Sequence, residues 1–253
     1  MKLSEFTAVM ERIAPQDLAM EFDNPGLLIE PDHDEIKRVL VALDCSKAVA
    51  EEATELGVDL VLTHHPLFFH PVKRLWYSQP DTAAACMLLR HGIGLFSAHT
   101  NLDAAQGGVN DTLCELMHIT DTIPFDEGIG RVGLLKEPVT LSEFASRAEQ
   151  LLQTSVRLCG SPEALVRRVA VMGGSGGSSI HPAAQERADV LLTGEIKHSD
   201  ALDAQVFGLN LVIAGHYETE RVVLAPLIRR LQNECFNVQY NLSRADVNPF
   251  VRL

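Results

Sequence analysis

Apolar runs and helical patterns alternate along the first half of the chain. Continuous apolar segments at residues 38–44, 59–65 and 93–99 predict strands that are buried on both faces. Segments 47–57 and 82–92, which lie between them, have the pattern of helices. Buried strands joined by helices predict an α/β fold with mostly parallel sheets covered by helices.

The second half repeats this order, and the similarity is visible in the letters. RVLVALD, from residue 38, aligns with RVAVMGG, from residue 168, at an offset of 130. VDLVLTH, from residue 58, aligns with ADVLLTG, from residue 188, at the same offset. We therefore predict an internal duplication with two similar α/β halves, residues 1–125 and 126–253.

Three connecting segments carry local signals. Residues 121–130 are loop-like, and the capping-box pattern Thr140-x-x-Glu143 predicts a helix that starts near Thr140. The glycine-rich segment 173–179 predicts a loop between a strand and a helix. That loop is either a flexible connector or a cradle whose backbone N–H groups bind phosphate.

Composition narrows the class of protein. The 253 residues are 46% hydrophobic and carry a formal net charge of −13, which argues against a nucleic-acid-binding protein. The five cysteines are odd in number and include no C-x-x-C pair, which favours a reducing compartment with single thiols over a disulfide framework. No signal-peptide pattern and no run of 18 apolar residues is present, so we expect a cytoplasmic protein without a membrane partner.

Candidate metal ligands follow four of the predicted strands. His64 and His65 end one strand, and the pattern His99-x-x-x-Asp103 follows another. In the second half, one strand ends in Gly-Glu-Ile-Lys-His and another in His-x-x-x-Glu. Because ligands collect at the carboxyl ends of strands in open α/β sheets, these side chains predict one site.

The ligand types point to two divalent ions. Imidazole and carboxylate together suit Zn, Fe, Mn, Ni or Co. Five ligands are too many for one tetrahedral ion with an open position, and about right for two. The predicted ligands, at a site between the two halves, are His64, His65, Asp103, His216 and Glu220. Glu195 and His99 occupy positions equivalent to ligands, so we assign them proton transfer or support of the ligands.

Five segments form an ordered set of motifs. They are EFDNPGLLI (21–29), THHPLFF (63–69), SAHTNLDAAQGGVND (97–111), TGEIKHSDAL (193–202) and GHYETER (215–221). In this order, and over nearly the whole chain, they resemble the NIF-three-like family, whose members are often named GTP cyclohydrolase I type 2 homologues. The short stretch between Asp126 and Thr140 resembles the compact members, which lack an inserted domain.

The resemblance implies a duplicated α/β protein with a dinuclear metal centre and a toroidal homohexamer. The ligands of the family correspond to the five residues already gathered. One departure is the frequent His-His pair of the family, which is His198-Ser199 here.

Three functions are consistent with these features. The first is a dinuclear metal-dependent hydrolase of a cytoplasmic small molecule, such as a phosphorylated purine nucleotide, with opening of the imidazole ring of GTP and release of formate as the named candidate. The second is a non-enzymatic metal-binding or metal-delivery protein. The third is a ring-shaped factor that binds nucleic acid or protein, which the net charge opposes.

Overall fold

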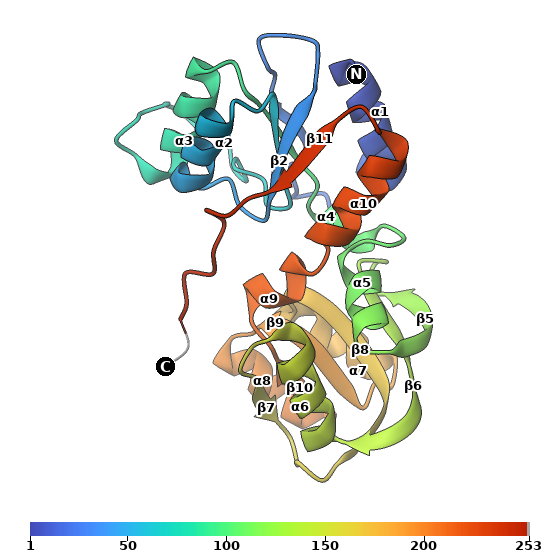
Figure 1. Cartoon of the computed structure of the whole chain (residues 1–253). Coiled ribbons are helices and arrows are strands. Elements are labelled where there is room, and N and C mark those ends of the chain that lie inside the picture. Colours follow the sequence, from blue (N-terminus) through green and yellow to red (C-terminus); the bar gives the residue numbers. More distant parts are fainter. Residues whose placement is uncertain (252–253) are drawn as a thin grey trace. The chain divides into compact units, whose positions relative to one another are not determined.

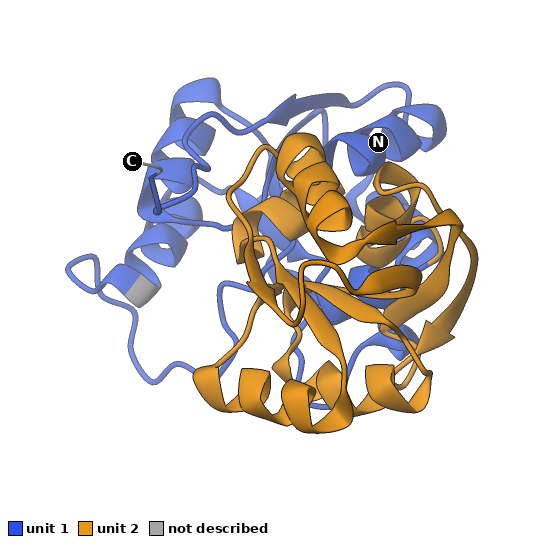
Figure 2. Ribbon diagram, turned by 90° about the horizontal axis from the view of Figure 1, so that it is seen from below, with its two compact units in different colours: residues 1–105, 224–251 blue, residues 106–223, 252–253 orange. Residues whose placement is uncertain are grey.

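The computed structural model describes residues 1–251, apart from the side chain of Asp81. The described chain divides into two compact units, coloured separately in Figure 2. Unit 1 comprises residues 1–105 and 224–251, and unit 2 comprises residues 106–223.

This division differs from the boundary that we predicted between residues 125 and 126. The last helix, α10 (Leu224–Glu234), and the last strand, β11 (Gln239–Leu242), belong to unit 1. The physical reason is strand pairing, since β11 lies parallel to β2 (Arg38–Ala42) and hydrogen-bonds along its whole length.

Unit 1 is built on a five-stranded sheet with the order β1-β4-β3-β2-β11. Its remaining strands are β1 (Gly26–Ile29), β3 (Leu60–Thr63) and β4 (Gly94–Ser97). Strands β11, β2, β3 and β4 are mutually parallel, and only β1 pairs antiparallel, with β4, among the described strands of this sheet. The prediction of a mostly parallel sheet therefore holds for unit 1.

Helices cover both faces of the unit 1 sheet (Figure 1). One face packs on α2 (Lys47–Leu56) and α3 (Pro80–Arg90), where Leu40 and Val61 of the sheet meet Ala53 and Leu88 of the helices. The other face packs on α1 (Leu3–Ile13), whose Phe6 ring lies edge-on to Phe96 at 6.2 Å between centroids. The unit is completed by α10, η1 (Gln16–Leu18) and α4 (Thr100–Ala104).

Unit 2 is built on a six-stranded sheet with the order β5-β6-β8-β9-β10-β7. The strands are β5 (Ile119–Phe125), β6 (Gly130–Thr140), β7 (Arg157–Cys159), β8 (Leu165–Ser175), β9 (Val190–Glu195) and β10 (Asn210–Ile213). Only β8, β9 and β10 are mutually parallel among these described strands. The other three pairings are antiparallel, so the prediction of a mostly parallel sheet is wrong for unit 2.

The helices of unit 2 also lie on both faces of its sheet. One face packs on α7 (Ile180–Gln185) and α8 (His198–Phe207), around Ala170, Leu191 and Leu211. The other face packs on α5 (Val109–Leu116), α6 (Leu141–Leu152) and α9 (His216–Arg221). A short turn of 3₁₀ helix, η2 (Gly177–Ser179), precedes α7. No helix among the described residues combines the length and the apolar character needed to cross a membrane.

The two units share an order of elements. In unit 1 the order is α1, β1, β2, α2, β3, α3, β4, α4, and in unit 2 it is α6, β7, β8, α7, β9, α8, β10, α9. Each series contains three parallel strands, and the third of them pairs antiparallel with a strand that precedes the first. Within each unit, the three parallel strands therefore have their carboxyl ends at one edge of the sheet.

Of two local sequence predictions, the structure confirms the helix cap at Thr140 but not the loop at 121–130. Thr140 caps α6 as predicted, because its hydroxyl accepts the Glu143 N–H at 3.2 Å and the Glu143 carboxylate accepts the Thr140 N–H at 2.8 Å. The loop predicted at 121–130 is instead the end of β5 and a tight turn into β6. This edge strand exposes most of its residues, so it lacks the apolar run by which buried strands are recognised.

Candidate metal centre

Three parallel strands of unit 1 end at the same edge of the sheet. His64 and His65 directly follow β3, and His99 follows β4 after Ala98. The strand ladder continues into these residues, since the His65 N–H donates to the Leu43 carbonyl at 2.9 Å. The backbone at this edge is therefore held by the sheet, and the side chains start from fixed positions.

The imidazoles of His64, His65 and His99 form a cluster. Their ring centroids lie 5.0 Å apart for His64 and His65, 5.2 Å for His64 and His99, and 5.6 Å for His65 and His99. Each histidine contributes one ring nitrogen to this cluster, and the three nitrogens all lie within 4.8 Å of one another. Such a group of nitrogens can hold a metal ion.

Each of the three rings uses its Nδ1 atom to contact an oxygen. Nδ1 of His64 lies 2.8 Å from the Ala98 carbonyl, and Nδ1 of His65 lies 2.9 Å from Asp44 Oδ1. Nδ1 of His99 lies 2.8 Å from Asp23 Oδ1. Carbonyl and carboxylate oxygens only accept, so each Nδ1 carries a proton, and the neutral form of a ring in this tautomer can bind a metal through Nε2.

Asp23 is the most strongly held of these acceptors, and its side chain is fully buried. Its carboxylate accepts the Thr100 N–H at 3.0 Å and also a hydrogen bond from the Thr100 hydroxyl. Burial raises the pKa of Asp23, but the hydrogen bonds from His99 and Thr100, together with the charge on His99, outweigh it and lower the pKa to about 2. Asp23 therefore stays ionised and orients the His99 ring.

Asp103 lies on α4, within reach of the histidine cluster. Its Oδ1 atom is 3.6 Å from Nε2 of His64, whose side chain is fully buried. Two ligands with bonds of about 2.1 Å and angles of about 90–120° are about 3.0–3.6 Å apart. The spacing of this pair is therefore that of two ligands of one ion.

In unit 2, His216 and Glu220 lie one turn apart on α9. Nε2 of His216 is 3.0 Å from Glu220 Oε2, which is also within the spacing of two ligands of one ion. Nδ1 of His216 is 3.1 Å from Glu195 Oε1, at the end of β9. Glu195 thus contacts a predicted ligand directly, and the Glu220 side chain is 5% exposed.

The glycine-rich segment is part of this unit 2 arrangement. Gly173 and Gly174 belong to β8, so the prediction of a loop over 173–179 is wrong for its first three residues. A Cβ atom on Gly174 would lie 2.0 Å from Glu220 Oε1 and 3.2 Å from His216 Nε2. Only glycine leaves room there for the buried carboxylate.

Three backbone N–H groups of this segment already have protein acceptors. The N–H groups of Gly173, Gly174 and Gly176 donate to Asn110 Oδ1, Thr219 Oγ1 and the Glu195 carbonyl. A phosphate cradle needs donors that point at the ligand. The phosphate-binding interpretation of the glycine-rich segment is therefore not supported.

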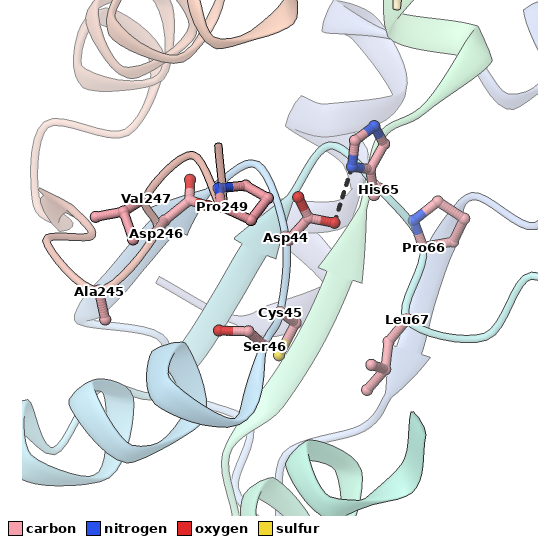
Figure 3. A pocket seen from close by; sticks show the side chains of 10 residues that line it. All are labelled: Asp44, Cys45, Ser46, His65, Pro66, Leu67, Ala245, Asp246, Val247 and Pro249. Atoms are coloured by element: carbon pink, nitrogen blue, oxygen red, sulfur yellow. Dashed lines mark hydrogen bonds and ion pairs between the residues drawn. The ribbon is translucent and has the colours of Figure 1, made fainter. Parts of the chain in front are cut away.

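A pocket of about 500 Å³ lies beside His65 in unit 1 (Figure 3). Asp44, His65 and Pro66 line it from the strand ends, and Leu67 adds apolar surface. Ala245, Asp246, Val247 and Pro249 of the C-terminal segment line it on the other side. This volume is within the usual range of small-molecule sites, about 300–1,000 Å³.

The seven predicted site residues thus occur in two sets. Unit 1 brings together His64, His65, His99 and Asp103, and unit 2 brings together His216, Glu220 and Glu195. Asp23 and Asp44, which orient two of the imidazoles, were not predicted from the sequence. Asp44 had a usable signal, since it ends the predicted strand 38–44 at the same edge as His64.

Comparisons with known proteins all point to one protein family. The family model of Duf34/NIF3 (NGG1p interacting factor 3) matches residues 1–249. A relative from Methanocaldococcus jannaschii, named GTP cyclohydrolase 1 type 2 homolog, is 38% identical over 87% of this chain and 90% of its own. A Clostridium perfringens relative of the same name is 33% identical over 99% of both chains.

Solved structures have the same fold. The Staphylococcus aureus protein SA1388 has a TM-score of 0.91 at 29% identity, and the match covers 100% of this chain and 99% of that one. Reduced HcgD from Methanocaldococcus jannaschii has a TM-score of 0.85 at 35% identity, and the match covers 96% of this chain and 97% of that one. The mixed α/β fold with two helix-covered sheets is therefore shared by these proteins.

Proposed function

Because the chain belongs to the Duf34/NIF3 family, we propose that it is a dinuclear metal-dependent hydrolase of a cytoplasmic small molecule. The observation that carries the proposal is the set of imidazole and carboxylate groups at the strand ends of each unit, with spacings that suit metal ligands. Two divalent ions, of Zn, Fe, Mn, Ni or Co, would be held by His64, His65, Asp103, His216 and Glu220.

The proposal includes an internal duplication that gave rise to the two halves. Supporting the duplication, the two units share an eight-element order and the pairing of their parallel strands. In both units a histidine follows the third parallel strand, and an acidic residue lies four positions later. This repeated position supports the proposal of ligands in each half.

The residues of this chain fit divalent ions chemically. The Nδ1 contacts favour the tautomer in which each unit 1 imidazole can bind a metal through Nε2, and carboxylates supply negative charge. When bound, such ions lower the pKa of water and so provide a nucleophile at neutral pH. Glu195 and His99 are the groups that would move protons to and from the substrate, because each lies beside a ligand and has an exchangeable proton or a lone pair.

The pocket beside His65 is the place that we propose for the substrate. Its volume suits a nucleotide, and it opens next to a proposed ligand. The relatives named GTP cyclohydrolase 1 type 2 homolog make opening of the purine ring of GTP, with release of formate, the candidate reaction. We further propose that the protein is cytoplasmic and that it assembles as a homohexamer. Analytical ultracentrifugation would test the hexamer.

The experiment is turnover of a nucleotide panel by protein that has been stripped and reloaded with each metal in turn. Formate release and the loss of purine absorbance report the reaction. Glu220→Gln should abolish turnover, since it removes a proposed ligand charge while keeping its shape. Glu218→Gln, on the same helix, is the matched control and should leave turnover unchanged.

Two results would count against the proposal. The first is the absence of metal-dependent turnover, and the second is equal turnover by Glu220→Gln and the wild type. Readily exchangeable metal without any turnover would favour a non-enzymatic metal-binding or metal-delivery protein over a hydrolase. A salt-dependent complex with duplex DNA would favour the nucleic-acid-binding alternative.

A further inference from the structure

Two exposed phenylalanines lie beside the strand-end site of unit 1. Phe22 and Phe69 are 61% and 40% exposed, and their ring centroids are 5.9 Å apart. The Phe69 ring also lies edge-on to the His99 ring, at 6.1 Å between centroids. We propose that this aromatic pair binds a planar heteroaromatic ring, such as a nucleobase, of the substrate. The inference rests on the proposed function and deepens it, because it names the residues that recognise this class of substrate.

Neighbouring residues hold the ring of Phe69 at the surface. Leu67 and Phe68, which precede it, pack against the core of unit 1 and anchor this segment. The Phe68 carbonyl accepts a hydrogen bond from Asn24 Nδ2 at 2.7 Å, which joins the segment to the one that carries Phe22. The two rings therefore stand on connected backbone. A side chain that is already in place loses little conformational freedom when a ligand binds to it.

The segment of Phe22 is also tied to the start of α4. The Met20 N–H donates to the Thr100 hydroxyl at 3.0 Å, and the Asp23 carboxylate accepts the Thr100 N–H at 3.0 Å. Asp23 is the same residue that orients the His99 ring, at 2.8 Å from Nδ1. The contacts that orient His99 therefore also set the place of the aromatic pair beside it.

The chemistry of the pair selects a flat ring. Phenylalanine has no polar atom with which to bind a charged or hydrogen-bonding group, and its face and edge favour other aromatic rings at about 4.5–7 Å between centroids. Both measured separations fall in that range, so Phe22, Phe69 and His99 form one continuous aromatic surface. Single exposed apolar side chains are common, whereas a contiguous group beside a polar site is typical of ligand recognition. Bases stack on aromatic side chains in this way in nucleic-acid-binding proteins.

The aromatic pair and the proposed substrate pocket meet the same histidines. His65 lines the pocket, and its ring centroid is 5.6 Å from that of His99. A substrate whose ring rests on Phe69 would therefore have the adjoining bonds beside the histidines, and the rest of the molecule could extend over His65 toward the pocket. The purine of the candidate reaction belongs to the class of rings that such a pair binds.

Calorimetric titration of metal-loaded protein with guanosine, adenosine and uridine tests ring binding without requiring turnover. The wild type should bind at least one of these nucleosides more tightly than ribose, which lacks the ring. Phe22→Ala/Phe69→Ala should weaken that binding by about 5- to 150-fold, the loss expected when a base no longer stacks on an aromatic side chain. Phe22→Tyr/Phe69→Tyr keeps both ring faces and should retain the affinity of the wild type.

Phe236→Ala is the matched control, because Phe236 belongs to the same unit and is 83% exposed. It should leave the nucleoside affinity unchanged. Analytical ultracentrifugation of every variant separates ligand binding from assembly, and all variants should sediment as the wild type does.

Three results would overturn the inference. They are a wild type that binds no nucleoside more tightly than ribose, a double alanine variant that keeps the nucleoside affinity, and a double alanine variant whose oligomeric state changes. The last result would place the pair at an interface between copies of this chain. The proposed function fails separately, when nucleosides bind through the pair but the metal-loaded protein turns over no nucleotide. Binding and turnover therefore distinguish the two failures.

Discussion

Gly174→Ala should disable the unit 2 ligand pair without touching a ligand. The new Cβ would lie 2.0 Å from Glu220 Oε1, a separation that real structures do not tolerate. The carboxylate must therefore move by about 1 Å, whereas metal–ligand distances tolerate only about 0.2 Å. We expect metal affinity to fall by more than about 10- to 100-fold, the loss caused by disturbing a ligand only indirectly.

A second effect of this substitution must be separated from the first. Gly174 has a φ of +62°, and placing alanine in this left-handed region costs about 1–2 kcal/mol. Gly208 offers a matched control, because its φ is +70° and a Cβ added there would meet nothing within 4 Å. Gly208→Ala should therefore lose a similar amount of stability and no metal affinity.

Urea denaturation of the metal-free variants measures the stability cost, and calorimetric titration with zinc measures the affinity. The expected result is similar destabilisation of both variants and loss of affinity in Gly174→Ala alone. Equal zinc affinity in the two variants would refute the reasoning, since it would mean that Glu220 is not a ligand or that its position does not matter.

Three further outcomes follow from individual contacts. Thr140→Ala should destabilise the protein by about 1 kcal/mol in urea denaturation, because it removes the cap of α6, whereas Thr140→Ser should not; equal loss in both would exclude the cap as the cause. Asp44→Ala should lower zinc affinity about 10- to 100-fold, because the Asp44 carboxylate orients the ring of His65. The loss of stability should be small, since the Asp44 side chain is 55% exposed. Unchanged zinc affinity would show that Asp44 does not support His65. Burial raises the pKa of Glu52, but hydrogen bonds from Ser243, Arg244 and Ala245 outweigh it and lower the pKa below 4.5. The stabilisation by Glu52 is therefore complete above pH 4.5 and is lost as the pH falls through the lower pKa of the folded state. The difference in unfolding free energy between wild type and Glu52→Gln, measured by urea denaturation, should therefore close in acid. A difference that persists in acid would contradict this assignment.

The chain order of apolar strands and helices was readable from the sequence alone. Residues 38–44, 59–65 and 93–99 are apolar because both faces of their strands are covered, and burial of that kind leaves a continuous run of letters. The candidate ligands were readable for a related reason. They follow those strands directly, and parallel strands end at a common edge, so sequence position implied proximity within each unit.

Tertiary structure alone decided which acceptors orient the imidazoles and which strands complete each sheet. Asp23 reaches His99 from 76 residues away, and β11 returns to β2 from the far end of the chain. No local periodicity records either event, because such contacts depend on the path of the chain between elements. The glycines of 173–174 are the same case, since they are required by the close approach of Val109 and Glu220 and not by any need for a flexible turn.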